Sequence, residues 1–182
     1  MTDYIELRKQ AMTDHTGKMP NRLKDDAAEE AFWGFQGCSE KNNTKRTLMQ
    51  KIVQQELLAL LKQDDHVLEI GPGWGNYTFD IAKEVRKLTC IDSSKSIISF
   101  LESQANEKGF ENMELIHDKW ESDNKKVKYD VVFGFNCYYR MSEIGHTLLK
   151  MNDSAARLAI VGMTTGPEKT SLYGIEATRI YD

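Results

Sequence analysis

The sequence predicts an α/β fold: a parallel sheet of five recognisable strands flanked by helices, with a helical extension at the N-terminus. Two observations support this prediction. From residue 64 onward, short apolar runs alternate with segments of helical periodicity, which is typical of parallel strands joined by right-handed crossovers. Continuous apolar runs such as Val131-Val132-Phe133 also indicate strands that are buried on both faces.

The predicted strands are short apolar runs bounded by polar or glycine-rich segments. They cover residues 66–71, 87–92, 113–118, 129–135 and 157–165. The helices between them are predicted over residues 77–85, 94–108 and 142–151. In the second of these helices, Ile97, Leu101 and Ala105 recur at helical spacing, and Gly109 is expected to end it as a C-cap. Ser142 is expected to cap the third helix at its start.

The chain before residue 64 is predicted to be helical and differs in character from the rest. Helical patterns cover residues 3–12, 22–35 and 44–62, and the second is expected to end near Gly34 and Gly37. The third carries an apolar stripe that is typical of a helix packed on a sheet, formed by Met49, Ile52, Val53, Leu57 and Leu60. The aromatic cluster at residues 32–35 has two interpretations, as ordinary core or as part of a lid over a ligand.

Length and composition limit the classes of function. The 182 residues are enough for one domain with a sizeable core, and no apolar run is long enough to cross a bilayer. The N-terminal residues do not combine a basic start with an apolar stretch, so we expect no secretory signal. The three cysteines lack the spacing of metal ligands, so we expect a cytoplasmic protein with free thiols and no metal. The net charge of −4 argues against nucleic acid as the main partner.

The most informative stretch is residues 67–75, Val-Leu-Glu-Ile-Gly-Pro-Gly-Trp-Gly. An apolar strand that ends in a glycine turn and feeds a helix is typical of a nucleotide-type site at the carboxyl edge of a parallel sheet. Asp92, at the end of the second predicted strand, is suitably placed to accept hydrogen bonds from ribose hydroxyls. The alternative is that Asp92 only caps the following helix.

The spacing of the glycines does not fit a dinucleotide site. Gly-x-Gly-x-x-Gly counted from Gly71 requires a third glycine at position 76, where Asn76 stands instead. Glu69 would in addition repel a pyrophosphate. An acid in this place suits a ligand with positive charge or hydroxyl donors.

Four motifs in order resemble those of the class I S-adenosylmethionine-dependent methyltransferases, which have a Rossmann-like fold. The first, acid-x-Gly-x-Gly-x-Gly, stands at residues 69–75, and the acid of the second strand is Asp92. Asp118 matches the acid that ends the third strand, and residues 129–136 match the motif of the fourth strand. The resemblance covers roughly residues 44–165. It implies a cofactor-binding domain over residues 44–182, with residues 1–43 as a helical extension or lid.

The resemblance implies a role for each motif. Glu69 would lie near the loop under the methionine moiety, and the glycines would form the floor of the pocket. Asp92 would bind the ribose, and Asp118 with the two residues after it would bracket the adenine. The implied cofactor-binding residues are Glu69, Gly71, Pro72, Gly73, Trp74, Gly75, Asp92, Ser93, Asp118, Lys119, Trp120 and Asn136.

The acceptor side is expected just past the fourth strand. Tyr138 and Tyr139 are the candidate catalytic residues there, and either could line the sulfonium or orient an acceptor. The alternative for each is plain packing. Methyl transfer from a sulfonium is an in-line displacement, so the protein would mainly supply proximity and alignment.

The chain departs from the family pattern at its C-terminal end. Family members usually have seven strands, and the residues after the fifth predicted strand cannot comfortably hold a helix and two more strands. We therefore expect the apolar edge of strand five to be covered, either in a homodimer or by the residues that follow it.

The function that these features favour is methyl transfer from S-adenosylmethionine to a small-molecule acceptor by a cytoplasmic enzyme, without nucleic acid or membrane partners. Two alternatives remain open. One is a non-catalytic module that binds the cofactor. The other is an NAD-dependent oxidoreductase, against which Glu69 and Asn76 argue.

Overall fold

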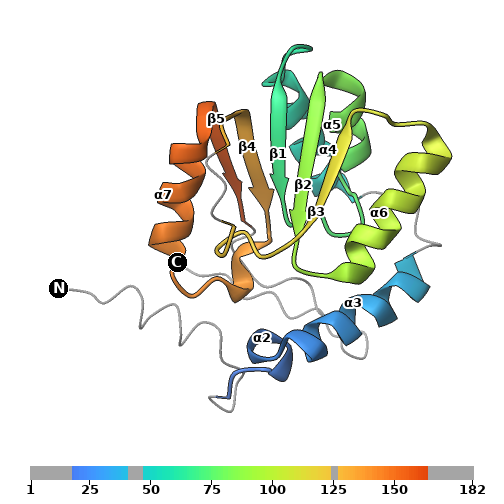
Figure 1. Cartoon of the computed structure of the whole chain (residues 1–182), viewed down its shortest axis with the longest axis vertical. Coiled ribbons are helices and arrows are strands. Elements are labelled where there is room, and N and C mark those ends of the chain that lie inside the picture. Colours follow the sequence, from blue (N-terminus) through green and yellow to red (C-terminus); the bar gives the residue numbers. More distant parts are fainter. Residues whose placement is uncertain (1–17, 41–46, 124–126, 164–182) are drawn as a thin grey trace.

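The computed structural model describes residues 18–40, 47–123 and 127–163. Its centre is a five-stranded parallel sheet in the order β3-β2-β1-β4-β5 (Figure 1). The strands are β1 (His66–Ile70), β2 (Lys87–Asp92), β3 (Met113–His117), β4 (Tyr129–Phe135) and β5 (Ala155–Gly162). The predicted fold class is confirmed. The strand order reverses direction at β1, so the carboxyl ends of β1 and β4 form a switch point where α/β folds bind ligands.

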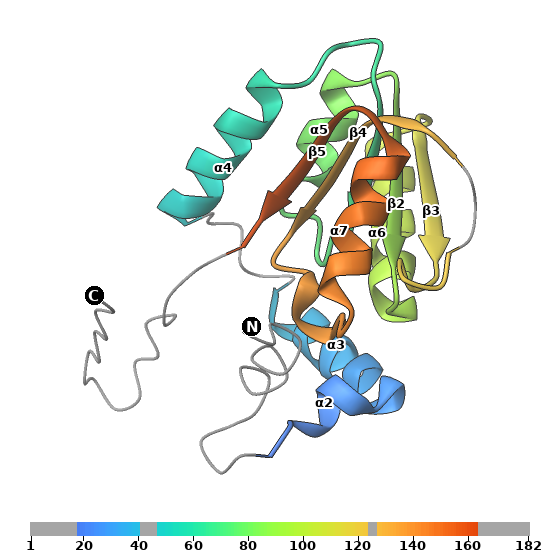
Figure 2. The ribbon, with the colours of Figure 1, turned by 90° about the vertical axis from the view of Figure 1, so that its left-hand side faces the viewer.

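Helices cover both faces of this sheet. They are α4 (Leu48–Ala59), α5 (Thr78–Glu84), α6 (Lys95–Lys108) and α7 (Ile144–Ser154), and Figure 2 shows α4 and α7 on opposite faces. Neighbouring residues of one strand accordingly belong to different core clusters. Val131 packs with Leu57 of α4, whereas Val132 packs with Met151 of α7. This two-sided burial explains why the strands are apolar without interruption.

The helix ends follow the local capping chemistry. The Ser94 hydroxyl accepts a hydrogen bond from the Ile97 amide at 3.3 Å, and Gly109 ends α6 in the left-handed conformation, as predicted. Helix α4 begins later than predicted because Thr47 and Gln50 form a capping box. The predicted cap at Ser142 is wrong: α7 begins after residue 143, without a side-chain cap bond.

The N-terminal helices lie across the carboxyl edge of the sheet (Figures 1 and 2). The pattern predicted over residues 22–35 is two helices, α2 (Asn21–Lys24) and α3 (Asp26–Glu40), because Asp25 ends the first and caps the second. Its carboxylate accepts hydrogen bonds from the amides of Ala27 and Ala28 at 2.7 and 3.1 Å. Helix α3 also continues through Gly34 and Gly37 rather than ending there, and the predicted helix at residues 3–12 lies outside the described residues.

Strand β5 is an edge strand that pairs with β4. Val161 and Met163 at its end are about half exposed. Residues from 164 on, which include the last two of the predicted strand, lie outside the described part of the chain, and so does their expected contact with this edge. Among the described residues, no helix combines the length and apolarity needed to span a membrane.

Candidate functional site

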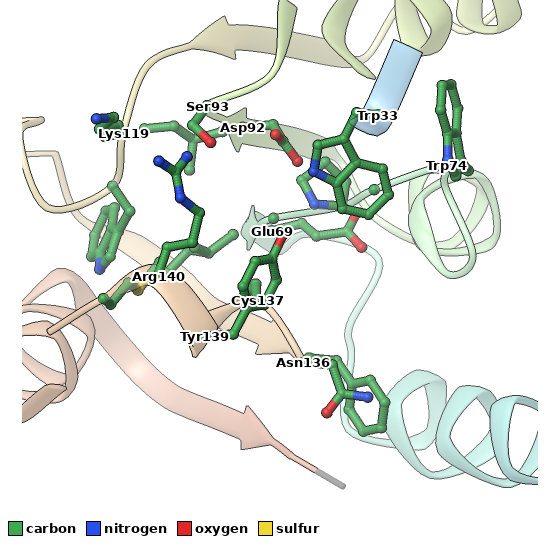
Figure 3. A pocket seen from close by; sticks show the side chains of 18 of the residues that line it. Trp33, Glu69, Trp74, Asp92, Ser93, Lys119, Asn136, Cys137, Tyr139 and Arg140 are labelled. Atoms are coloured by element: carbon green, nitrogen blue, oxygen red, sulfur yellow. The ribbon is translucent and has the colours of Figure 1, made fainter. Parts of the chain in front are cut away.

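A cavity of about 690 Å³ opens at the carboxyl edge of the sheet, between the strand ends and α3. The loops after β1, β2, β3 and β4 all contribute to it (Figure 3). Because these strands are parallel and adjacent, residues more than sixty positions apart in the sequence meet here. The predicted site residues that line it are Glu69, Gly71, Pro72, Gly73, Trp74, Asp92, Ser93, Asp118, Lys119, Trp120, Asn136 and Tyr139.

The glycine loop needs its glycines for three different reasons. All three have positive φ, which side-chain-bearing residues rarely adopt. A Cβ on Gly71 would lie 2.3 Å from the Cβ of Cys137, so this glycine lets the loop pack against the end of β4. A Cβ on Gly75 would lie 2.8 Å from the Phe79 ring, and Gly75 does not line the cavity. Above Gly73 the nearest atom belongs to Trp33 at 4.0 Å, so this glycine keeps the cavity floor open.

Glu69 is a buried acid at the base of this cavity. Its carboxylate accepts a hydrogen bond from the Thr78 hydroxyl at 2.7 Å, and only 2% of the residue is exposed. Burial raises the pKa of Glu69 to about 7, and the hydrogen bond from Thr78 partly offsets this rise. A cationic group in the cavity would compensate for the loss of hydration and hold Glu69 in its charged form.

Asp92 lies at the end of β2 and faces the same cavity (Figure 3). Its carboxylate accepts a hydrogen bond from the Ser94 amide at 2.9 Å, while the side-chain cap of α6 comes from Ser94 itself. Loss of hydration raises the pKa of Asp92 to about 6. Two acids with raised pKa values in one cavity are typical of a functional site rather than of a simple cap.

The ends of β3 and β4 supply the other walls. The Asp118 carboxylate accepts a hydrogen bond from the Lys119 amide at 2.7 Å, and Trp120 is almost fully buried. Asn136 has φ of 53°, unusual for a residue other than glycine, and its amide donates to the Gly162 carbonyl at 2.9 Å. Such a conformation at a strand end is a common feature of ligand sites.

The two candidate tyrosines point in different directions. Tyr138 is 1% exposed, belongs to the core cluster and donates to the Gly134 carbonyl at 3.0 Å. It does not line the cavity, so the structure supports the packing alternative for this residue. Tyr139 lines the cavity, and its hydroxyl donates to the Glu29 carboxylate at 2.5 Å.

Burial raises the pKa of the Cys137 thiol to about 12, which leaves it protonated and unreactive at neutral pH.

Helix α3 contributes Glu29, which the sequence did not reveal, and Trp33, which belongs to the aromatic cluster interpreted either as core or as part of a lid. Glu29 is 2% exposed and accepts hydrogen bonds from the Trp33 indole at 2.8 Å and from Arg22 at 3.1 Å, besides that from Tyr139. Trp33 lines the cavity and its ring lies edge-on to Trp74, with ring centres 6.2 Å apart. The position of Trp33 in the cavity lining favours the lid interpretation of this residue. The signal for Glu29 was its four-residue spacing from Trp33, which does not indicate which part of the protein the pair faces.

Comparisons with known proteins agree with this geometry. Residues 67–156 match the family described as "Methyltransferase domain". The ribosomal RNA small subunit methyltransferase A of Malacoplasma penetrans is 26% identical over 116 residues, which are 64% of this chain and 42% of that protein. A probable enzyme of the same name from Pyrococcus furiosus is 39% identical over 72 residues, 37% of this chain and 25% of that protein. The chain thus spans less than half the length of these relatives.

The fold is also found in a solved structure, a dimethyladenosine transferase from Plasmodium falciparum. Its TM-score is 0.53 at 23% identity, and the match covers 65% of this chain and 42% of that one. At this identity the likeness concerns the fold alone.

The relatives overturn the expectation of a small-molecule acceptor without nucleic acid. Curated relatives are named as ribosomal RNA small subunit methyltransferases, which act on a nucleic acid. The expectation was wrong because net charge averages over the whole surface and does not report the charges around one cavity.

The cavity fits the cofactor that the sequence motifs imply. It offers Glu69 and Asp92 to a ligand with positive charge and ribose hydroxyls, aromatic side chains to its rings, and an open floor at Gly73. Motifs, fold and family match therefore agree. The chain belongs to the class I S-adenosylmethionine-dependent methyltransferases, whose cofactor is S-adenosylmethionine.

Proposed function

We propose that this protein transfers the methyl group of S-adenosylmethionine to a nucleotide of RNA. The observation that carries the proposal is the match to ribosomal RNA methyltransferases, joined to a cavity whose acids suit the cofactor. The cytoplasmic location expected from the sequence is part of this proposal.

The chemistry asks for alignment more than for acid–base catalysis. When bound, S-adenosylmethionine would supply a methyl carbon on a positively charged sulfur, a good leaving group for in-line displacement by a nucleophile of the acceptor. Glu69 and Asp92 provide the negative charge that holds the cofactor, and the glycine loop lets it approach the backbone. Loss of hydration and the neighbouring Glu29 raise the pKa of Tyr139, so its hydroxyl stays protonated and serves to orient rather than to accept a proton.

We also propose that α3 acts as the lid of the cavity. Three acids of this helix support the idea, because each contacts a different part of the sheet domain. Glu29 accepts from Tyr139, Asp26 pairs with the loops after β3 and β4, and Glu30 accepts from the amides of Lys95 and Ser96 at 3.0 and 2.9 Å. Closing this helix over the cofactor would exclude water from the reacting groups.

The test is transfer of labelled methyl from S-adenosylmethionine to small-subunit ribosomal RNA. We expect label in the RNA with the natural protein and with Asp64→Ala, an exposed control, and at least about tenfold less with Asp92→Ala, which loses a charged hydrogen-bond acceptor. Cofactor binding without any label in RNA would overturn the proposal and favour a non-catalytic binding module.

A further inference from the structure

One carboxylate of α3 is held by two cations at the rim of the cavity. Asp26 Oδ2 lies 2.7 Å from Lys119 Nζ, and Asp26 Oδ1 lies 2.6 Å from Arg140 Nη2. Lys119 follows β3, and Arg140 ends the short helix η1 (Tyr138–Arg140) that follows β4. Both cations line the cavity, and Figure 3 shows the Arg140 side chain extending from its loop toward the side on which Lys119 lies.

The two sides of this contact differ in how firmly the sheet domain holds them. The Arg140 side chain is 16% exposed, and its Nε is buried without a hydrogen-bond partner among the described residues. Asp26 comes from the first turn of α3, and its side chain is 63% exposed. Arg140 is therefore the firmly held cation. The Lys119 side chain is 44% exposed, and Asp26 is the most exposed of the three, so solvent screens it and a competing anion can reach it.

The two cations suit a phosphodiester as well as a carboxylate. A guanidinium and an ammonium that meet two oxygens of one group can bind a phosphate in the same way. A backbone phosphate of RNA has two non-bridging oxygens, one for each cation, and a buried donor without a partner, such as Arg140 Nε, favours any ligand oxygen that reaches it. Lys24 of α2 is a further cation among the residues that line this cavity.

We propose that Lys119 and Arg140 bind a backbone phosphate of the RNA acceptor, and that Asp26 occupies this site as an internal anion until RNA displaces it. The inference rests on the proposed function and adds a binding site to it. It also couples the acceptor to the lid, since displacing Asp26 frees the first turn of α3. The contacts of Glu29 with Tyr139 and of Glu30 with Ser96 would still hold the rest of that helix.

Binding of a single-stranded RNA oligonucleotide, measured by fluorescence anisotropy over a range of salt, tests the site. We expect Asp26→Asn to bind RNA about three- to tenfold more tightly, because the internal competitor is gone. The double variant Lys119→Gln/Arg140→Gln should bind at least about tenfold more weakly, and its slope of log affinity against log salt should fall by about 0.7, the contribution of one phosphate of a single strand. Asp64→Asn and Lys62→Gln/Lys83→Gln, at exposed positions outside the cavity lining, are matched controls and should bind like the natural protein.

Titration of the same variants with S-adenosylhomocysteine distinguishes a phosphate site from an ion pair that only holds α3 in place. We expect Asp26→Asn to change the affinity for S-adenosylhomocysteine by less than about twofold, a difference too small for the loss of a cofactor contact. Weaker S-adenosylhomocysteine binding with unchanged RNA binding would show that Asp26 only holds the lid, and would overturn the inference. If RNA is bound and methylated but the double variant behaves like its control, the inference fails while the proposed function stands. RNA binding by none of the proteins would overturn both.

Discussion

Glu69 and Asp92 make the charge of the cavity depend on pH near neutrality. Their raised pKa values, about 7 and about 6, mean that each carboxyl holds a proton to a higher pH than an exposed acid does. A ligand that carries an ammonium group favours the ionised forms. Binding at a pH below these values therefore has to release protons.

We accordingly expect the affinity for S-adenosylhomocysteine to rise as the pH increases through about 6 and about 7, and to level off above them. Calorimetric titration at about pH 6 in two buffers of different ionisation enthalpy measures the released protons directly. Glu69→Gln, which cannot ionise at this position, should release fewer. An affinity that is the same at about pH 5 and about pH 8 would contradict this reading of the two acids.

At the scale of elements, the glycine loop after β1 joins the cofactor site to the packing of the sheet. Gly71 has φ of 62° and lies against Cys137, whereas Gly109 has φ of 73° at the end of α6 with nothing within 4 Å of its virtual Cβ. The two glycines share a conformation but not an environment.

Gly71→Ala should therefore destabilise the protein more than Gly109→Ala. The control carries only the left-handed penalty of roughly 1–2 kcal/mol, and Gly71→Ala adds roughly 1–3 kcal/mol for forcing a methyl group into packed atoms. Urea unfolding of both variants gives the comparison. Equal losses of unfolding free energy would show that the loop moves aside without cost.

The proposed role of α3 as a lid can be tested through its contact with α6. Glu30 joins α3 to the first turn of α6, so Glu30→Ala removes a charged acceptor from two amides. We expect the backbone amides of α3 to exchange hydrogen at least about fivefold faster in this variant, with the amides of β1 and β4 unchanged. Glu102→Ala, an exposed change on α6, is the control. Unchanged exchange in α3 would mean that Glu30 does not dock the helix.

The sequence was a good guide to elements and a poor one to contacts between distant segments. Strands β2 and β4 have the predicted bounds because continuous apolar runs with turn residues on both sides leave few alternatives. The pattern over residues 22–35 was interpreted as one helix, although Asp25 is a residue type that commonly caps a helix and so marked the break. The start of α7 was misplaced since Ser142 is a good cap that the chain does not use.

At the scale of the whole molecule, the site combines two classes of residue. Those on the strand ends, such as Glu69 and Asp92, could be predicted because the topology of a parallel sheet brings the strand ends together. The partners of Tyr139 and Arg140 on α3 could not, because over a hundred residues separate them in the chain and no periodicity links them. For the same reason, the acidic net charge of the sequence did not indicate that Lys119 and Arg140 lie together at the rim of the cavity.

We propose that the glycine loop and Asp92 form the S-adenosylmethionine site of this protein. Calorimetric titration with S-adenosylhomocysteine and, in parallel, with NAD tests this assignment. We expect S-adenosylhomocysteine to bind, at least about tenfold more weakly to Asp92→Ala and with unchanged affinity to Asp64→Ala, and we expect no binding of NAD. Binding of NAD alone, or S-adenosylhomocysteine binding that Asp92→Ala leaves intact, would contradict it.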